Sequence, residues 1–201
     1  KMTELGYTNS FDVLDARDFG IPQARERVFC ISTLDNEPFD FTKLQHKPMR
    51  HIEAFLEPNV IDPKYMITIP SMKNKIEEFN PVQPNDTYKR RLGVIESHCW
   101  TITERQDRCP NAGIIRLKNV ARYRYLTERE VWRLMGFDDS DFDLMLKQFP
   151  TKKGFRNATL YALAGNSIVV PILEELFRVI IEKSQELEAK VSHNTQLKLT
   201  V

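Results

Sequence analysis

The chain has 201 residues and a formal net charge of +1, with 41% hydrophobic and 28% charged residues. This composition supports one or two compact units with a substantial core. No apolar run approaches the roughly 20 residues that cross a bilayer, and no signal-peptide pattern is present, so we expect neither a membrane protein nor a secreted one. The cysteines Cys30, Cys99 and Cys109 are widely spaced and no histidines cluster with them. We therefore expect no disulfide framework and no bound metal.

The first 33 residues predict a short helix end followed by two strands. Gly6 ends the helical pattern of residues 1–6, and apolar residues at 11–14 and 27–33 predict strands on either side of a Gly-Ile-Pro turn. Lys1 stands partway into an apolar pattern, so we expect further chain upstream.

"GIPQARERVFCIST", residues 20–33, places polar side chains at every second position before the second strand. Alternation in an extended segment puts Gln23, Arg25 and Arg27 on one face. Two guanidinium groups beside an amide suit a phosphate, a carboxylate or a base edge, whereas an exposed strand end would leave them solvated. The apolar residues that follow predict that this face lies at the mouth of a buried sheet, where α/β proteins bind ligands.

Residues 35–119 predict a loop-rich segment of short strands, because prolines recur and apolar residues come in short runs. Within it, "CWTITER" alternates Trp100 and Ile102 with Thr101 and Thr103. This pattern fits an ordinary half-buried strand or a strand whose hydroxyl groups contact phosphate. Residues 89–133 hold eleven Lys or Arg against five Asp or Glu, which is a modest sign of a polyanionic partner, although such charge runs are more often solvated faces.

Two helices are predicted in the last third of the chain. Thr127 and Glu130 form a capping box that opens a helix ending at Gly136. A second helix begins at Pro171, and its predicted buried stripe is Ile172, Leu173, Leu176, Val179 and Ile180. Just before it, "ALAGNSIVVP" predicts a tight turn that either holds a polar ligand or is only structural.

"IPQARERVF", "TIT", "RYLTEREVWRLMGF" and "AGNSIVVP", in this order, resemble the closing motifs of the cytosine-C5 DNA methyltransferases. The resemblance covers residues 1–37 and 99–182, and the segment between them stands where that family keeps its variable target-recognition region. It implies an α/β fold, the C-terminal part of a Rossmann-like, S-adenosylmethionine-dependent methyltransferase with a small, loop-rich, mainly β target-recognition domain. In that family the target cytosine is flipped into a pocket between two domains.

The resemblance also implies a division of the chain. Residues 1–37 would form the last strands of the catalytic domain, and residues 38–137 the target-recognition domain with its framework helix. Residues 138–190 would supply a linker, the cofactor-pocket turn and a C-terminal helix that packs back on the catalytic domain. A frayed tail would follow at residues 191–201. Framework roles are implied for Leu126, Glu130, Leu134 and Gly136.

Site roles follow at the positions that match the family's motifs. Arg27 would hydrogen-bond the O2 edge of the flipped cytosine, while Arg25 and Gln23 would complete the catalytic set by bracing the active-site loop and nearby backbone. The S-adenosylmethionine pocket would be lined by Gly165, Asn166 and Ser167. Leu163 stands where the family often has Gln, which puts one polar contact near the cofactor in doubt.

Target recognition is expected within residues 85–118, whose polar side chains match the edges of bases and the phosphate oxygens. Thr101 would contact the phosphate beside the flipped nucleotide, with Thr103 on the same strand. The remaining expected DNA contacts are Arg105, Gln106, Arg108 and Asn111 for reading sequence, and Lys89, Arg90 and Arg91 chiefly for holding phosphates.

The nucleophilic cysteine, the acidic group and the glycine-rich turn of the family lie on Pro-Cys, Glu-Asn-Val and Phe-x-Gly-x-Gly segments, and none of these occurs here. We interpret the chain as the second half of a methyltransferase, inactive alone, that is either a subunit of a split enzyme or a piece of a longer chain. Its expected partners are double-stranded DNA and the missing N-terminal half. Its expected location is the cytoplasm in a bacterium or phage host and the nucleus in a eukaryote.

Two other interpretations remain open at this point. The chain is alternatively a non-catalytic DNA-binding module or a decayed methyltransferase remnant that kept the fold. A helix-turn-helix regulator built on residues 127–137 is disfavoured, because that helix uses its apolar side chains for packing instead of exposing polar ones to bases.

Overall fold

The computed structural model describes residues 1–34, 37–76, 92–117 and 122–199. Its strands are β1 (Thr8–Asp15), β2 (Gln23–Ala24), β3 (Glu26–Thr33), β4 (Cys99–Trp100), β5 (Ile115–Arg116) and β6 (Tyr123–Arg124). Its α-helices are α1 (Pro70–Lys73), α2 (Glu128–Arg133), α3 (Asp139–Gln148), α4 (Ala158–Asn166) and α5 (Val170–Leu199). Five short 3-10 helices lie at Thr3–Leu5, Ala16–Asp18, Phe41–Lys43, Ile52–Phe55 and Pro63–Tyr65.

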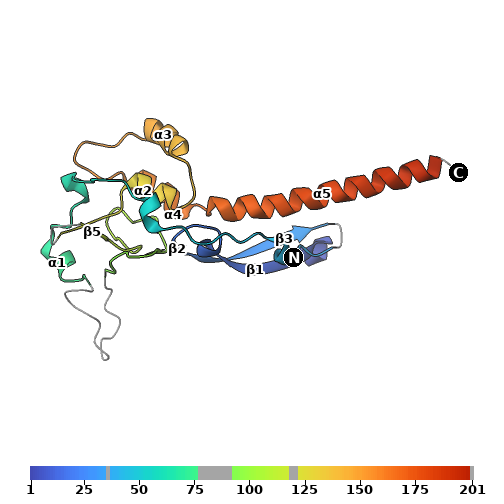
Figure 1. Cartoon of the computed structure of the whole chain (residues 1–201), viewed down its shortest axis with the longest axis horizontal. Coiled ribbons are helices and arrows are strands. Elements are labelled where there is room, and N and C mark those ends of the chain that lie inside the picture. The colour runs from blue at the N-terminus through green and yellow to red at the C-terminus, as the bar shows by residue number, and fades with distance from the viewer. Residues whose placement is uncertain (35–36, 77–91, 118–121, 200–201) are drawn as a thin grey trace, which may run out of the picture.

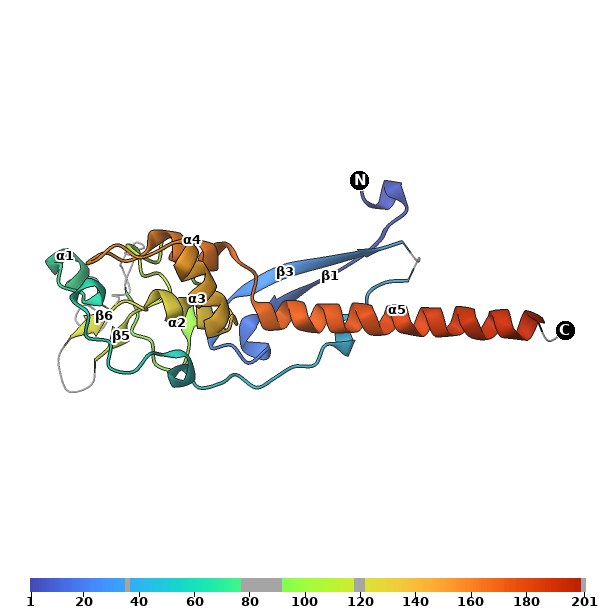
Figure 2. The ribbon, with the colours of Figure 1, turned by 90° about the horizontal axis from the view of Figure 1, so that it is seen from above.

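The elongated end of the molecule is made by β1, β3 and α5, which run side by side in two views (Figures 1 and 2). β1 and β3 pair antiparallel with Val13 opposite Val28, so both predicted strands are confirmed and are longer than expected. Phe29 and Ile31 turn inward onto the main core, which also contains the buried Ile172, Leu176 and Val179 of α5. The predicted buried stripe of the last helix is therefore correct.

The outer face of the β1–β3 hairpin is apolar and open. Phe11, Val13 and Val28 are 75%, 57% and 68% exposed. The expectation that the apolar residues after Arg27 form a buried sheet is wrong for the described residues, because only one face of this hairpin is covered. Period-two alternation determines which side chains share a face, but it does not determine whether anything covers that face.

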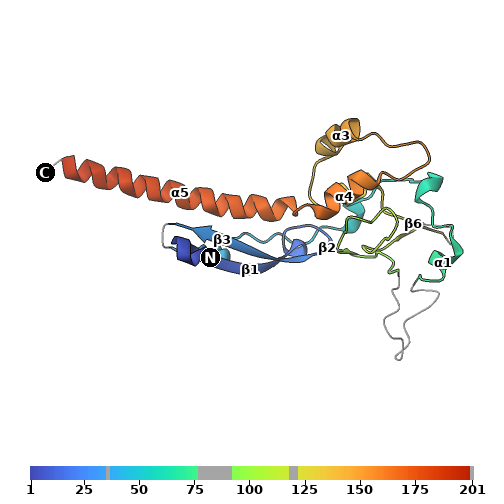
Figure 3. The ribbon, with the colours of Figure 1, turned by 180° about the vertical axis from the view of Figure 1, so that it is seen from behind.

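The globular end, with the α1–α4 region, is loop-rich as predicted (Figure 3). Its sheets are minimal, since β2 pairs with β4 in parallel and β5 pairs with β6 antiparallel over two residues each. The expected mainly β character is thus limited to short ladders between 3-10 turns. A small second core sits here, built from Ile67, Ile76, Leu92, Ile114, Tyr123 and Tyr125.

Helix α2 begins at the predicted capping box. Thr127 Oγ1 accepts the backbone N–H of Glu130 at 3.2 Å, and Glu130 Oε2 accepts the backbone N–H of Thr127 at 2.8 Å. The helical run ends at Gly136, whose φ of 86° suits glycine. A Cβ at Gly136 would lie 2.4 Å from Pro171 Cδ, so this glycine also lets the start of α5 approach closely.

Two helices occupy residues where the sequence predicted a linker and a turn. α3 follows α2 and is tied to it by Arg133, which donates to Asp139 at 2.7 and 2.6 Å and lowers the pKa of that carboxyl group. α4 includes Gly165 and Asn166 in its last turn, so the predicted Gly-Asn-Ser turn is a helix end with Ser167 as its C-cap. α5 continues to Leu199, so over residues 191–199 the chain is helical where a frayed tail was expected.

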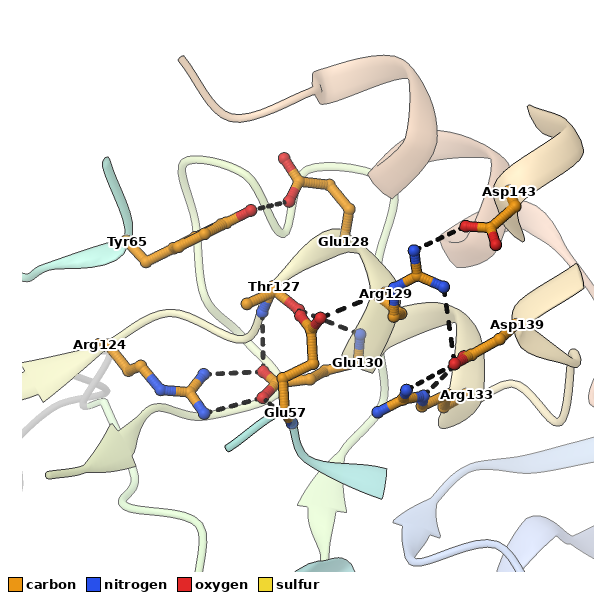
Figure 4. Close-up of polar contacts among 10 residues, drawn as sticks. All are labelled: Glu57, Tyr65, Arg124, Thr127, Glu128, Arg129, Glu130, Arg133, Asp139 and Asp143. Carbon is orange, nitrogen blue, oxygen red and sulfur yellow. Dashed lines mark hydrogen bonds and ion pairs between the residues drawn. The ribbon is translucent and has the colours of Figure 1, made fainter. Parts of the chain in front are cut away.

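A buried ion pair links α2 to β6 within the globular end (Figure 4). Arg124 donates to both carboxylate oxygens of Glu130 at 2.7 and 2.8 Å, and both side chains are almost inaccessible to solvent. The same carboxylate accepts the backbone N–H of Glu57 at 2.8 Å. One acidic side chain thus fixes three separate chain segments.

Replacing Arg124 with Met should lower the free energy of unfolding by about 3 to 5 kcal/mol, because it leaves the Glu130 charge buried without its partner. Urea denaturation measures this loss. The matched control is Arg133→Ala, which removes a more exposed ion pair and should change stability by about 1 kcal/mol or less. Equal losses in the two variants would contradict the central role of the Arg124–Glu130 pair.

Candidate functional site

Gln23 joins the end of α2 to the segment at residues 101–103. Its amide is fully buried. Gln23 Nε2 donates to the carbonyl oxygen of Leu134 at 2.8 Å, and Gln23 Oε1 accepts the backbone N–H of Ile102 at 3.0 Å. Pairing of β2 with β4 sets Gln23 opposite Cys99 and makes this possible. Gln23 therefore positions backbone and does not face a ligand.

Arg25 joins the same segment to the end of α4. Its guanidinium donates to the carbonyl oxygens of Ile102 at 2.8 Å, Ser167 at 2.8 Å and Gly165 at 3.2 Å. Burial, with a smaller effect of the Arg27 charge, lowers the pKa of Arg25 to about 10, so the group stays charged at neutral pH. Like Gln23, Arg25 is a positioning residue in this structure, because its hydrogen bonds go to the chain's own carbonyl groups.

Gly165 lets α4 touch the polypeptide after Ile102. A Cβ at this position would lie 2.3 Å from the Thr103 carbonyl carbon and 2.4 Å from the Glu104 nitrogen. Real Cβ atoms do not approach backbone so closely, so any side chain would push the two segments apart. The glycine is required here for close approach, and its backbone is helical.

Arg27 differs from its two alternating neighbours because its side chain is exposed. Its one hydrogen bond among the described residues goes to the carbonyl oxygen of the adjacent Glu26 at 2.7 Å. It lines an open cleft of about 370 Å³ together with Asn166, Ser167 and the apolar Phe29 and Ile172. The structure thus brings Arg27 and the Asn166–Ser167 pair together across more than 130 residues of sequence.

This cleft has the composition of a small-molecule site. Apolar side chains form much of its wall, and two guanidinium groups, an amide and a hydroxyl are also in its lining. Its volume lies within the roughly 300 to 1,000 Å³ typical of ligand pockets. Ser167 Oγ donates to the carbonyl oxygen of Ile168 at 3.1 Å and keeps its lone pairs as acceptors.

The hydroxyl groups of Thr101 and Thr103 both make hydrogen bonds within the chain. Thr101 Oγ1 donates to the carbonyl oxygen of Ala24 at 2.8 Å, and Asn111 Nδ2 donates to Thr103 Oγ1 at 3.3 Å. The predicted alternation is correct for the buried Ile102 but not for Trp100, which is 60% exposed.

The loop after Thr103 presents arginines to solvent. Arg105 and Arg108 are exposed, as residues that contact DNA must be. Gln106 is fully buried and accepts the backbone N–H of Ala112 at 3.2 Å, so it supports the loop from inside and does not fit the base-reading role expected from sequence. Lys89, Arg90 and Arg91 lie outside the described residues.

One residue that sequence reasoning missed is Arg156, just before α4. Its guanidinium lies 3.9 Å from the ring centre of Tyr125 and donates to backbone carbonyl groups of the loop segments. No local pattern marks it, because its partners are carbonyl oxygens that any residue would supply.

Of the three cysteines, Cys30 lies in the lining of the cleft, whereas Cys99 and Cys109 do not. Burial raises the pKa of the Cys99 thiol to about 12, which keeps it protonated. Cys30 and Cys109 are exposed free thiols. Within the described ranges, no cluster of three or more His, Cys, Asp or Glu side chains could hold a metal ion. In the same part of the chain, no helix has the length and apolarity needed to span a membrane.

Solved structures define the class of protein to which this fold corresponds. The Dnmt2 methyltransferase of S. pombe matches 90% of this chain with a TM-score of 0.67 at 22% identity, over 58% of its own length. The Entamoeba histolytica methyltransferase EhMeth matches 90% with a TM-score of 0.64 at 18% identity, over 56% of its length. The predicted α/β methyltransferase fold class is confirmed.

Sequence comparison then gives the family. The model for C-5 cytosine-specific DNA methylases matches residues 1–182, and the chain belongs to this family. The Type II methyltransferase M2.ScrFI of Lactococcus lactis subsp. cremoris is 39% identical over 92% of the chain and 48% of the relative. The orphan methyltransferase M.SssI of Spiroplasma monobiae is 30% identical over 88% and 45%. The chain thus spans about half the length of these relatives.

Replacing Gly165 with Ala should lower the free energy of unfolding by about 1 to 3 kcal/mol, through overpacking against the Thr103–Glu104 peptide. In an unobstructed helix the same change stabilises by about 1 kcal/mol, so a loss isolates the clash. Thermal or urea unfolding measures it. Thr159→Ala, an exposed position on the same helix, should change stability by about 0.5 kcal/mol or less. A Gly165→Ala variant as stable as the parent would contradict the close approach.

Proposed function

We propose that this chain supplies the base-contacting arginine, the DNA-recognition loop and part of the cofactor cleft of a cytosine-C5 DNA methyltransferase. A further polypeptide segment, on the same chain or on another, supplies the nucleophilic cysteine and the glycine-rich cofactor turn. The observation that carries the proposal is the cleft in which Arg27 meets Asn166 and Ser167. Family membership over residues 1–182 supports it.

The residues of the cleft fit S-adenosylmethionine at one side. The exposed Asn166 amide and the Ser167 hydroxyl offer polar contacts to the methionine part, and Phe29, Val169 and Ile172 offer an apolar wall. S-adenosylmethionine supplies an electrophilic methyl group on a sulfonium centre. This chain's contribution is to bind one side of the molecule and to exclude water from it.

Arg27 is suited to the target base. Its guanidinium is exposed at the mouth of the cleft and has a single neighbouring carbonyl as partner, so it is available to a new acceptor. The O2 edge of a cytosine flipped out of the duplex is such an acceptor. Arg25 and Gln23 hold the backbone on which Arg27 stands, and Thr101 would contact the adjacent phosphate. Attack on C6 requires a thiolate that none of this chain's cysteines is assigned to supply.

Double-stranded DNA is the proposed partner of the loop from Thr103 to Asn111. Arg105 and Arg108 point to solvent from this loop, and arginine pairs with guanine in the major groove. Lys89, Arg90, Arg91 and Asn111 are proposed to hold phosphates or the loop itself. The protein would act in the cytoplasm of a bacterium or phage host, or in the nucleus of a eukaryote.

The outer face of the β1–β3 hairpin is the proposed docking surface for the remaining segment. Three apolar side chains lie exposed on it in adjacent rows, Phe11, Val13 and Val28. An exposed apolar patch of this kind is typical of a surface that another part of a protein covers.

The purified chain alone should transfer no methyl group, and mixing it with a polypeptide that carries the Pro-Cys, Glu-Asn-Val and Phe-x-Gly-x-Gly segments should restore transfer. The assay follows label from S-adenosylmethionine into cytosine of duplex DNA. Phe11→Asp should reduce the restored activity at least about tenfold, because a charge on the docking face must be desolvated on assembly. Leu144→Asp, at an apolar position on α3 that is 63% exposed, is the matched control and should assemble normally.

Methyl transfer by the chain alone would overturn the proposed division of the enzyme. Equal activity of the Phe11→Asp and Leu144→Asp assemblies would place the docking surface elsewhere.

Arg27→Ala in the completed enzyme should slow methyl transfer at least about tenfold, since a charged hydrogen bond typically contributes about 1.5 to 3 kcal/mol. DNA affinity should change little, because this group acts on the flipped base. Single-turnover rates and DNA-binding constants separate the two effects. Lys147→Ala, an exposed cation on α3, serves as the control. An unchanged single-turnover rate in Arg27→Ala would mean that Arg27 is only a solvated strand end.

A further inference from the structure

Helix α4 contacts the recognition loop at both of its ends. At its C-terminal end, Gly165 lies against the Thr103–Glu104 peptide. Immediately before its N-terminus, Arg156 reaches the carbonyl oxygen of Asp107 with its Nε at 2.5 Å. The loop from Thr103 to Asn111, which carries Arg105 and Arg108, is therefore mounted on the helix that also carries Asn166.

Arg156 makes three contacts that fix its direction. Besides Asp107, its Nη1 donates to the carbonyl oxygen of Lys64, and its guanidinium stacks over the ring of Tyr125 at 3.9 Å. A planar guanidinium with two backbone acceptors and an aromatic face below it has little rotational freedom. Arg156 thus joins the Lys64 turn, the end of β6 and the recognition loop.

Several hydrogen bonds lie within the loop. Its backbone turns include the bonds from Cys109 N–H to the Arg105 carbonyl at 2.8 Å and from Gln106 N–H to the Thr103 carbonyl at 3.3 Å, and its side-chain bonds are those of Asn111 with Thr103 at 3.3 Å and of Gln106 with Ala112 at 3.2 Å. These fix the shape of the turn. The bond from Arg156 to Asp107 fixes where the turn stands relative to α4, and Asp107 lies between the two exposed arginines.

The residue beside Arg156 anchors the same junction to α2. Asn157 accepts the backbone N–H of Leu160 and caps α4, and its own backbone N–H donates to Glu128 Oε1 at 2.6 Å. Arg156 therefore extends from a backbone that is held at the next residue, and such support is the condition for a side chain to position something else.

We propose that Arg156 is the positioning residue that sets the recognition loop on α4, so that the groups reading DNA and the turn facing the cofactor keep one fixed relation. This inference rests on the proposed function. It predicts a specific defect: loss of Arg156 loosens base discrimination, while affinity for S-adenosylmethionine is retained through the intact Arg25 and Gly165 contacts.

The test uses the completed enzyme and compares kcat/KM on the preferred duplex with kcat/KM on duplexes changed at single base pairs. In Arg156→Ala this ratio should fall about fivefold or more at one position, in the direction of Arg105→Ala, as expected when a base contact is displaced. The KM for S-adenosylmethionine should stay within about twofold. Arg156→Lys, which keeps the charge but not the planar fork, should lie between Arg156→Ala and the parent.

Arg129→Ala is the matched control. Arg129 also stacks on an aromatic ring, that of Phe142 at 4.5 Å, and pairs with Asp143 at 2.6 Å, but none of its described contacts reaches the loop. It should lose stability without losing discrimination. Melting temperatures of all variants show whether a change in the ratio follows stability alone.

An unchanged ratio in Arg156→Ala, with a reduced ratio in Arg105→Ala, would overturn the inference and leave the proposed function intact. Equal loss of discrimination in Arg129→Ala would also overturn it. If Arg156→Ala does not fold, the same ratio of kcat/KM values is measured in Arg156→Lys, and an unchanged ratio in that variant would overturn the inference. Absence of methyl transfer in the completed parent enzyme would contradict the proposed function and this inference with it.

Discussion

The carboxylate of Glu130 is the group on which the arrangement of the globular end depends. It is buried and accepts hydrogen bonds from the Arg124 guanidinium and from the backbone N–H groups of Thr127 and Glu57. A buried charge is tolerated only when its partners are all in place, since the desolvation of each ion amounts to several kcal/mol. The three segments that donate to it therefore cannot move independently. This requirement holds the first turn of α2 in place. The other end of the helix, including the Leu134 carbonyl group, is therefore held in place as well.

A chain of hydrogen bonds connects α2 to the site. Gln23 donates to the Leu134 carbonyl oxygen and accepts the Ile102 N–H. Arg25 donates to the Ile102 carbonyl oxygen and also to that of Ser167 at the end of α4. Trp132 adds a second route, since its Nε1 donates to the Leu160 carbonyl of α4 at 2.9 Å. Two of the three polar side chains that alternate before β3 thus satisfy buried backbone groups that would otherwise lack partners. The hydrogen bonds of the buried Gln23 and Arg25 fix this stretch of backbone, and the exposed Arg27 extends from it.

Much of the local structure could be predicted from sequence because its causes are local. The capping box at Thr127, the stop at Gly136 and the buried stripe of α5 depend on residues within a few positions of one another. The features that were missed have distant causes. Position 165 requires glycine because the Thr103–Glu104 peptide leaves no room for a side chain, Gln106 is buried because the loop closes over it, and α3 and α4 are stabilised by contacts with α2. Arg156 donates to main-chain oxygens, which carry no trace in the sequence.

The contrast between paired and unpaired polar groups separates support from function in this chain. The Arg25 guanidinium and Gln106 Oε1 bond to buried backbone, and displacing them would leave those backbone groups unsatisfied. Gln106 Nε2 is buried and has no hydrogen-bond partner among the described residues. Among the described residues, Arg27 donates to a neighbouring carbonyl group, and Arg105 donates to a neighbouring carboxylate at 3.3 Å between exposed side chains. An exposed ion pair contributes about 0 to 1 kcal/mol, whereas a good contact with a base contributes about 1 to 3 kcal/mol of discrimination. Under the proposed function, the arginines that the fold holds least tightly are therefore the ones that lose least when they engage DNA.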